Sequence, residues 1–142
     1  MNVLLLPVIV PLFGAALLMV FRRARARFLT AVTTAVLTLA VQVTIAVRVF
    51  REGPVAAQMA GWEAPFGITL AVDGLSAVLL VLSGTVGLLS VFFVNASLAA
   101  EPKRGYANLL KRAREIFGAH ALFQFLFMGV NLSFITGDVF NL

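Results

Sequence analysis

The sequence predicts an all-α integral membrane protein with four membrane-spanning helices, forming one membrane domain over residues 1–142. Three observations predict this class. Of the 142 residues, 61% are hydrophobic and only 12% are charged, whereas about a quarter of the residues in a soluble domain are charged. The apolar residues gather in four runs, each near or above the ~20 residues that cross a bilayer as a helix. Nine of the eleven basic residues lie in two short blocks beside these runs, which is typical of juxtamembrane charge.

The first apolar run covers residues 3–21. At ~1.5 Å per residue its length matches the hydrocarbon layer. Pro7 and Pro11 lie one turn apart, and each lacks a backbone donor, so we expect a kink or a loosened first turn. The basic residues follow this run, whereas those of a cleavable signal peptide precede its apolar region.

The second run covers residues 28–50. Its threonines are expected to donate their hydroxyls to carbonyls of the same helix. Gln42 is the one strongly polar residue in its interior, and we expect a hydrogen bond to a neighbouring helix. Arg48 is close enough to the end of the run to reach the headgroup region.

The third run covers residues 70–98 and the fourth covers 116–136. The third is longer than a span requires, so it either tilts or begins outside the lipid. Gly84 and Gly87 give it one face that another helix can approach closely. The amphipathic stretch at 107–117 is either a helix on the membrane surface or an extension of the fourth span.

The charges predict an orientation. The connections at 22–27 and 99–115 hold the nine basic residues, whereas the connection at 48–73 holds two arginines and three acids. Because basic connections stay in the cytoplasm, both chain termini are expected outside, in a multi-pass protein of the plasma membrane.

Several functions are excluded by composition. The chain has no cysteine and one histidine, so disulfides, zinc–thiolate sites, iron–sulfur clusters and multi-histidine metal sites cannot form within it. No phosphate-binding loop, carboxylate pair or nucleophile–base arrangement is recognisable. We therefore expect no catalytic, cofactor-binding or metal-binding residues and no enzyme activity. The basic residues flank spans rather than form one soluble face, which argues against nucleic-acid binding.

Four polar residues are candidates for an ion path or for structural roles, namely Asp73, His120, Asn131 and Asp138. A charge at a helix centre costs about 2.5–3.5 kcal/mol, and both carboxylates and His120 lie near span ends, where an interfacial role explains them. Asp73 precedes a helix start, so it is either a helix cap or a carboxylate at which ions arrive. The chain thus offers only fragments of an ion path.

Two long motifs carry a family resemblance. The first comprises Gly61, Trp62, residues 64–68, Asp73 and residues 75–77, and the second comprises Gln124, residues 129–131, Phe134 and residues 136–142. In this order they resemble the N-terminal part of the D subunit of Mrp-type multisubunit Na⁺/H⁺ antiporters. The segment at 101–119 departs from the family pattern by being more basic.

The resemblance implies the first part of a fourteen-helix fold, related to the proton-pumping subunits of complex I and of membrane-bound hydrogenases. It implies other membrane subunits as partners, Na⁺ and H⁺ as transported ions, and no cofactor. The family's essential glutamate and lysines fall after Leu142, so we expect a truncated or split subunit that contributes packing and assembly rather than ion transfer. The alternatives are a small structural subunit of a related complex and an inactive relic.

Overall fold

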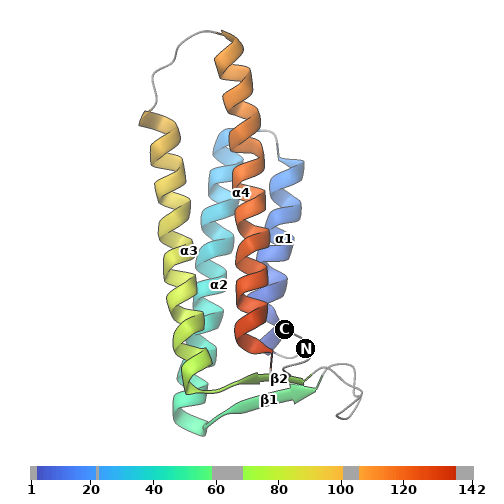
Figure 1. The fold of residues 1–142 in the computed structure, drawn as a ribbon, viewed down its shortest axis with the longest axis vertical. Helices are drawn as coiled ribbons and strands as arrows, with labels where there is room; N and C mark the ends of the chain where they lie inside the picture. The colour runs from blue at the N-terminus through green and yellow to red at the C-terminus, as the bar shows by residue number, and fades with distance from the viewer. Residues whose placement is uncertain (1–2, 22, 59–68, 101–105, 137–142) are drawn as a thin grey trace.

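The computed structural model describes residues 3–21, 23–58, 69–100 and 106–136. Four long helices lie side by side, and the chain runs alternately up and down through them (Figure 1). The elements in chain order are η1 (Val3–Leu5), α1 (Leu6–Val20), α2 (Ala24–Glu52), β1 (Val55–Gln58), β2 (Thr69–Val72), α3 (Gly74–Ala100) and α4 (Tyr106–Ile135). The described residues thus contain four helices long and apolar enough to cross a membrane, as predicted.

A small two-stranded sheet lies across one end of the bundle, which we call the sheet end (Figure 1). Strands β1 and β2 are antiparallel, with Val55 opposite Val72 and Gln58 opposite Thr69. Leu70 also forms a bridge with Thr136, just beyond α4. Gly53 turns the chain out of α2 with a φ of 92°, a backbone conformation that favours glycine. The sheet therefore ties the ends of α2, α3 and α4 together.

Three helices begin four or more residues away from the predicted position. The third helix begins at Gly74 rather than residue 70, because residues 69–72 form β2. A short apolar run suits a buried strand as well as a helix, so the pattern could not separate the two. Helices α2 and α4 begin at Ala24 and Tyr106, before the apolar runs. The stretch at 107–117 is thus an extension of the fourth span, not a separate surface helix.

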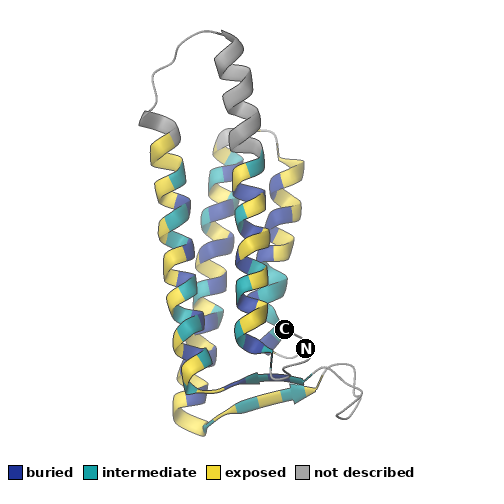
Figure 2. Ribbon diagram, in the orientation of Figure 1, coloured by how far each residue is buried: buried dark blue, intermediate teal, exposed yellow. Residues whose placement is uncertain are grey.

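The helices close into a ring in the order α1, α2, α3, α4, with α1 also packed against α4. One apolar cluster lies at the sheet end and another at the opposite end, where α1 ends and α2 begins. Figure 2 shows exposed residues along the outward faces of the helices. Many of these residues are large and apolar: 63% to 72% of the surface of Phe13, Leu29, Phe93 and Leu122 is exposed. Apolar residues on both the inside and the outside of a bundle indicate lipid as the solvent.

Candidate functional site

Seven polar side chains are buried among the described residues, and all of them lie on α2 and α4. We call this set the polar seam; its members are Arg27, Thr34, Thr38, Gln42, His120, Gln124 and Asn131. They are spaced four or seven residues apart on each helix, and this spacing puts them on one helix face. The seam therefore follows the bundle interior from the end opposite the sheet, alongside the second apolar cluster, toward the cluster at the sheet end.

Asn131 is the centre of the seam toward the sheet end. Its Oδ1 accepts hydrogen bonds from Gln42 Nε2 and from Ser83 Oγ, both at 2.9 Å. Its Nδ2 donates to the Pro7 carbonyl at 2.9 Å. One amide thus joins α4 to the three other helices. The hydrogen bond expected from Gln42 to a neighbouring helix is confirmed.

The bond to Pro7 has a cause in the sequence. In a helix the carbonyl of residue 7 accepts from the N–H of residue 11, and Pro11, inside α1, has none. The Pro7 carbonyl is thereby left without its donor, and Pro7 is buried. A buried carbonyl without a partner is costly in lipid. The Asn131 amide supplies the missing donor from another helix.

Gly84 makes room for Gln42. A Cβ at position 84 would collide with Gln42 Oε1 and would lie 2.9 Å from Leu39 Cδ1. The Gln42 side chain is fully buried, so it fills the space that the glycine leaves. A Cβ added at Gly87, on the same helix, would lie 2.8 Å from the Phe127 ring. The glycine face predicted on the third helix is thus the surface where α2 and α4 approach it.

A second connection lies further from the sheet. Gln124 Nε2 donates to Thr34 Oγ1 at 2.7 Å and so joins α4 to α2. The Thr34 hydroxyl itself donates to the Thr30 carbonyl at 2.8 Å. A Cβ at Gly14 of α1 would lie 2.7 Å from the Thr34 methyl group. Three helices therefore pack closely around this threonine.

Arg27 and His120 form the end of the seam opposite the sheet. Both are buried, with 3% and 4% of their surfaces exposed, and they are close enough to interact electrostatically. Arg27 lies in the first turn of α2, and His120 lies near the start of the apolar part of α4. The two basic side chains therefore lie near those ends of the α2 and α4 spans that are remote from the sheet.

Hydroxyls on the outer faces are satisfied within their own helices. Six exposed or partly exposed hydroxyls donate to carbonyls three or four residues earlier, at 2.7 to 2.8 Å, namely those of Thr30, Thr33, Thr44, Thr85, Ser90 and Ser133. The prediction that the α2 threonines donate their hydroxyls to carbonyls of the same helix is confirmed. These residues therefore expose no free donor to lipid.

Asp73 caps α3. Its Oδ1 accepts from the Ser76 N–H at 2.7 Å, and its carbonyl accepts from the Ala77 N–H at 2.9 Å. This is the geometry of an N-cap, in which a carboxylate satisfies a free N–H of the first turn. The Ser76 N–H also lowers the pKa of the Asp73 carboxyl below its ordinary value.

Asp73→Ala should destabilise the chain, whereas Asp73→Asn should not, because asparagine caps as well as aspartate. Since the native pKa is lowered, the contribution of the carboxylate is complete above the unfolded-state pKa and is lost as the pH falls through the native pKa. Unfolding of the variants in SDS at several pH values tests this. If Asp73→Asn instead leaves assembly intact in a transporting complex but abolishes transport, the carboxylate acts in ion uptake.

The other predicted site residues are placed as follows. Asn131 lies within the seam, and Asp138 lies outside the described residues, as do residues 61–68 of the first motif. Over the described ranges, no group of three metal-binding side chains occurs. Sequence reasoning missed Gln124, Thr34 and Ser83 as partners. For Gln124 and Thr34, the sequence did carry a signal of a shared polar face. Gln124 is four residues from His120 and Thr34 is eight residues from Gln42, and these spacings put each pair on one helix face.

Comparison with known proteins adds the following. The chain is 30% identical, over 99% of its length, to the D subunit of the Na⁺/H⁺ antiporter of Alkalihalophilus pseudofirmus. It is 29% identical over the same share to the protein of that name in Bacillus subtilis. The D subunit of a probable K⁺/H⁺ antiporter of Rhizobium meliloti is 38% identical over 60% of the chain. No family model matches.

These alignments cover only part of each relative. The chain spans 26% of the length of the first two proteins and 13% of the third. The predicted resemblance to the N-terminal part of antiporter D subunits is confirmed. The chain is thus a multi-pass membrane protein that is similar to one part of a transporter subunit, not to a classical enzyme.

Proposed function

We propose that this chain is a membrane subunit, or the N-terminal portion of one, of a multisubunit cation/proton antiporter. The observation that carries the proposal is the alignment over 99% of the chain with D subunits from two organisms. Its partners would be the other membrane subunits of the complex, and the ions moved would be H⁺ and Na⁺. Within the complex, the chain would contribute packing and assembly rather than ion-transfer groups.

The bonding of the seam supports the packing role. Between its ends, the seam consists of amides and hydroxyls, and these connect helices directly. No Asp, Glu or Lys is buried among the described residues. A group that takes up and releases protons or binds a cation within a membrane is usually a carboxylate, lysine or histidine. The only seam residue of that kind is His120, at the end opposite the sheet.

The charges support an orientation with the sheet end outside the cell. Cysteines introduced at the exposed residues Arg23 and Gln58 of the natural cysteine-free chain should then react from opposite sides of the plasma membrane. Gln58 should react with a membrane-impermeant maleimide in whole cells, and Arg23 only after the cells are opened. Reaction of both in whole cells would contradict the four-span topology, and the reverse pattern would contradict the orientation.

A replacement experiment tests the function. In an antiporter-deficient host, this chain would replace the aligned quarter of the Bacillus subtilis protein, with the rest of that complex supplied. We expect the hybrid to assemble and to restore sodium-dependent dissipation of a pH gradient in membrane vesicles. The purified chain alone, in liposomes, should leave the gradient intact.

The outcomes separate the alternatives. Assembly without exchange would favour a structural subunit of another complex, and failure of both would favour an inactive relic. Sodium-dependent exchange by the chain alone would show that it carries ion-transfer groups itself. A hybrid with Gln42→Leu serves as the control, because it removes a seam contact without changing any charge.

A further inference from the structure

A cavity of about 280 Å³ opens at the sheet end, between η1, α2 and β1. Its wall is apolar except for the side chains of two residues; the lining residues are Val3, Leu4, Thr44, Ile45, Arg48, Val55, Ala56 and Ala57. The Thr44 hydroxyl is already used, because it donates to the Ala40 carbonyl. Among the described residues that line the cavity, Arg48 is the one with a cationic side chain.

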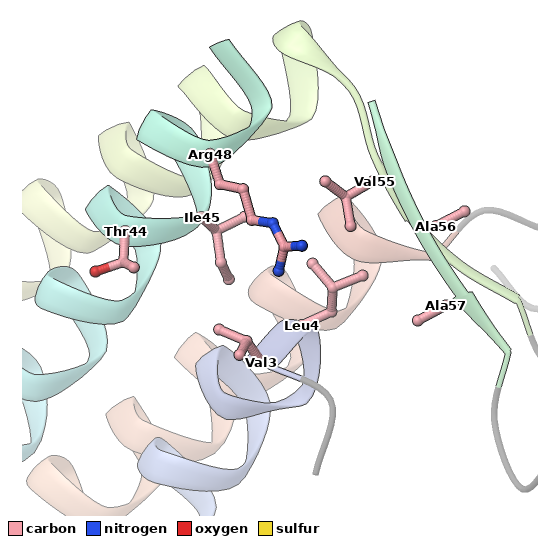
Figure 3. Close-up of a pocket in the computed structure, with 8 residues that line it drawn as sticks. All are labelled: Val3, Leu4, Thr44, Ile45, Arg48, Val55, Ala56 and Ala57. Atoms are coloured by element: carbon pink, nitrogen blue, oxygen red, sulfur yellow. The ribbon is translucent and has the colours of Figure 1, made fainter. Parts of the chain in front are cut away.

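The Arg48 side chain leans away from α2 over the cavity, and its guanidinium lies between Ile45, Leu4 and Val55 (Figure 3). Its Nε donates to Glu52 at 2.8 Å, and both side chains of this pair are more than half exposed, at 56% and 61%. An exposed pair of this kind contributes little to stability. A guanidinium has five N–H groups, so four remain to bind an anion.

The depth of Arg48 in the membrane indicates which anion it meets. The α2 span has 28 residues, about 42 Å at 1.5 Å per residue, against a hydrocarbon layer of about 30 Å. A centred, upright α2 therefore extends about 6 Å, or about four residues, beyond the hydrocarbon on each side. Arg48 is four residues before Glu52, the last residue of α2. Its guanidinium thus lies at the boundary between acyl chains and phosphates.

We propose that this cavity binds one phospholipid from the leaflet at the sheet end. The lipid phosphate binds the Arg48 guanidinium through charge-assisted hydrogen bonds, which are short and often bidentate. The glycerol and the first part of an acyl chain pack on Leu4, Ile45 and Val55. A cavity of about 280 Å³ is small for a whole ligand, so the rest of the lipid lies in the bilayer. This proposal does not depend on the proposed function.

Native mass spectrometry of the purified 142-residue chain tests the proposal. Three probes are compared, namely phosphatidylglycerol, diacylglycerol and glycerol 3-phosphate. We expect one phosphatidylglycerol to remain bound after the detergent is removed. Arg48→Gln should lower the bound fraction about tenfold, the expected effect of losing a charge-assisted contact. Diacylglycerol lacks the phosphate and glycerol 3-phosphate lacks the chains, so both should bind much less.

Three variants serve as controls, each checked for helix content by circular dichroism. Arg51→Gln removes an exposed charge in the same helical turn that does not line the cavity, and it should bind lipid normally. Glu52→Gln removes a negative charge near the phosphate and should retain lipid at least as well. Ala57→Phe fills the cavity while keeping every charge, and it should lose lipid even if Arg48→Gln does not fold.

Several results would overturn the proposal. Equal binding by the Arg48→Gln and natural chains, or equal losses in Arg48→Gln and Arg51→Gln, would show that Arg48 has no specific role. Equal retention of diacylglycerol would show an apolar contact only, and binding of glycerol 3-phosphate as tight as that of the lipid would show a simple anion site. Unchanged binding by a folded Ala57→Phe chain would place the lipid elsewhere.

Discussion

Replacing Asn131 with leucine should destabilise the bundle by about 1–3 kcal/mol. The substitution leaves the buried Pro7 carbonyl without its 2.9 Å donor, and it leaves Gln42 Nε2, which loses its 2.9 Å acceptor, with only its 3.5 Å bond to Ser83 Oγ. Ser83 is affected less, since its hydroxyl can donate to the Leu80 carbonyl at 2.9 Å instead. The measurement is an unfolding titration in SDS mixed micelles. Unfolding is monitored by energy transfer between dyes attached to cysteines introduced into α1 and α3.

The control is Ser133→Leu on the same helix. Ser133 is exposed and bonds only to its own helix, so its loss should change the free energy of unfolding little. In a Pro11→Ala background, the cost of Asn131→Leu should fall, because the restored amide at position 11 can donate to the Pro7 carbonyl. An unchanged cost in that background would contradict the role assigned to the Asn131–Pro7 bond.

Gly84→Val should destabilise the bundle by at least about 1–3 kcal/mol, the usual effect of overpacking a well-packed interior. A Cβ at this position already collides with Gln42 Oε1 and approaches Leu39 Cδ1 to 2.9 Å. Either α3 moves away from α2, or the Gln42 amide turns and loses Asn131. The same SDS titration measures the loss, and cysteine crosslinking between α2 and α3 reports any separation of these helices.

The matched control is Gly129→Val on α4. Gly129 is exposed, and no atom lies within 4 Å of a Cβ built there. Gly129 also lies inside a membrane-spanning helix, and the change of side chain is the same, but no neighbouring helix is close to it. Equal losses in the two variants would mean that the cost comes from helix propensity rather than from the contact with Gln42.

The span count could be predicted from the sequence because hydropathy and length are local properties of the chain. A run such as residues 3–21 is too apolar for water and long enough for the bilayer wherever its neighbours lie. The same holds for the cap at Asp73, since its partner Ser76 is three residues away. The strand at residues 69–72 was not predictable in this way, because its partner is β1 and a four-residue apolar segment has no decisive period.

The sequence alone therefore determined that the chain forms four apolar helices, that Gln42 needs a partner and that Gly84 allows a close approach. Only the tertiary structure decided which groups meet. Asn131 and Pro7 are 124 residues apart in the chain, and their contact depends on the rotation of α4 and on its place next to α1. Outward and inward faces in lipid are both apolar, so the sequence carries little signal for that rotation. The few buried amides favour this arrangement, because it gives Gln42 Nε2, Gln124 Nε2 and the Asn131 amide partners on other helices.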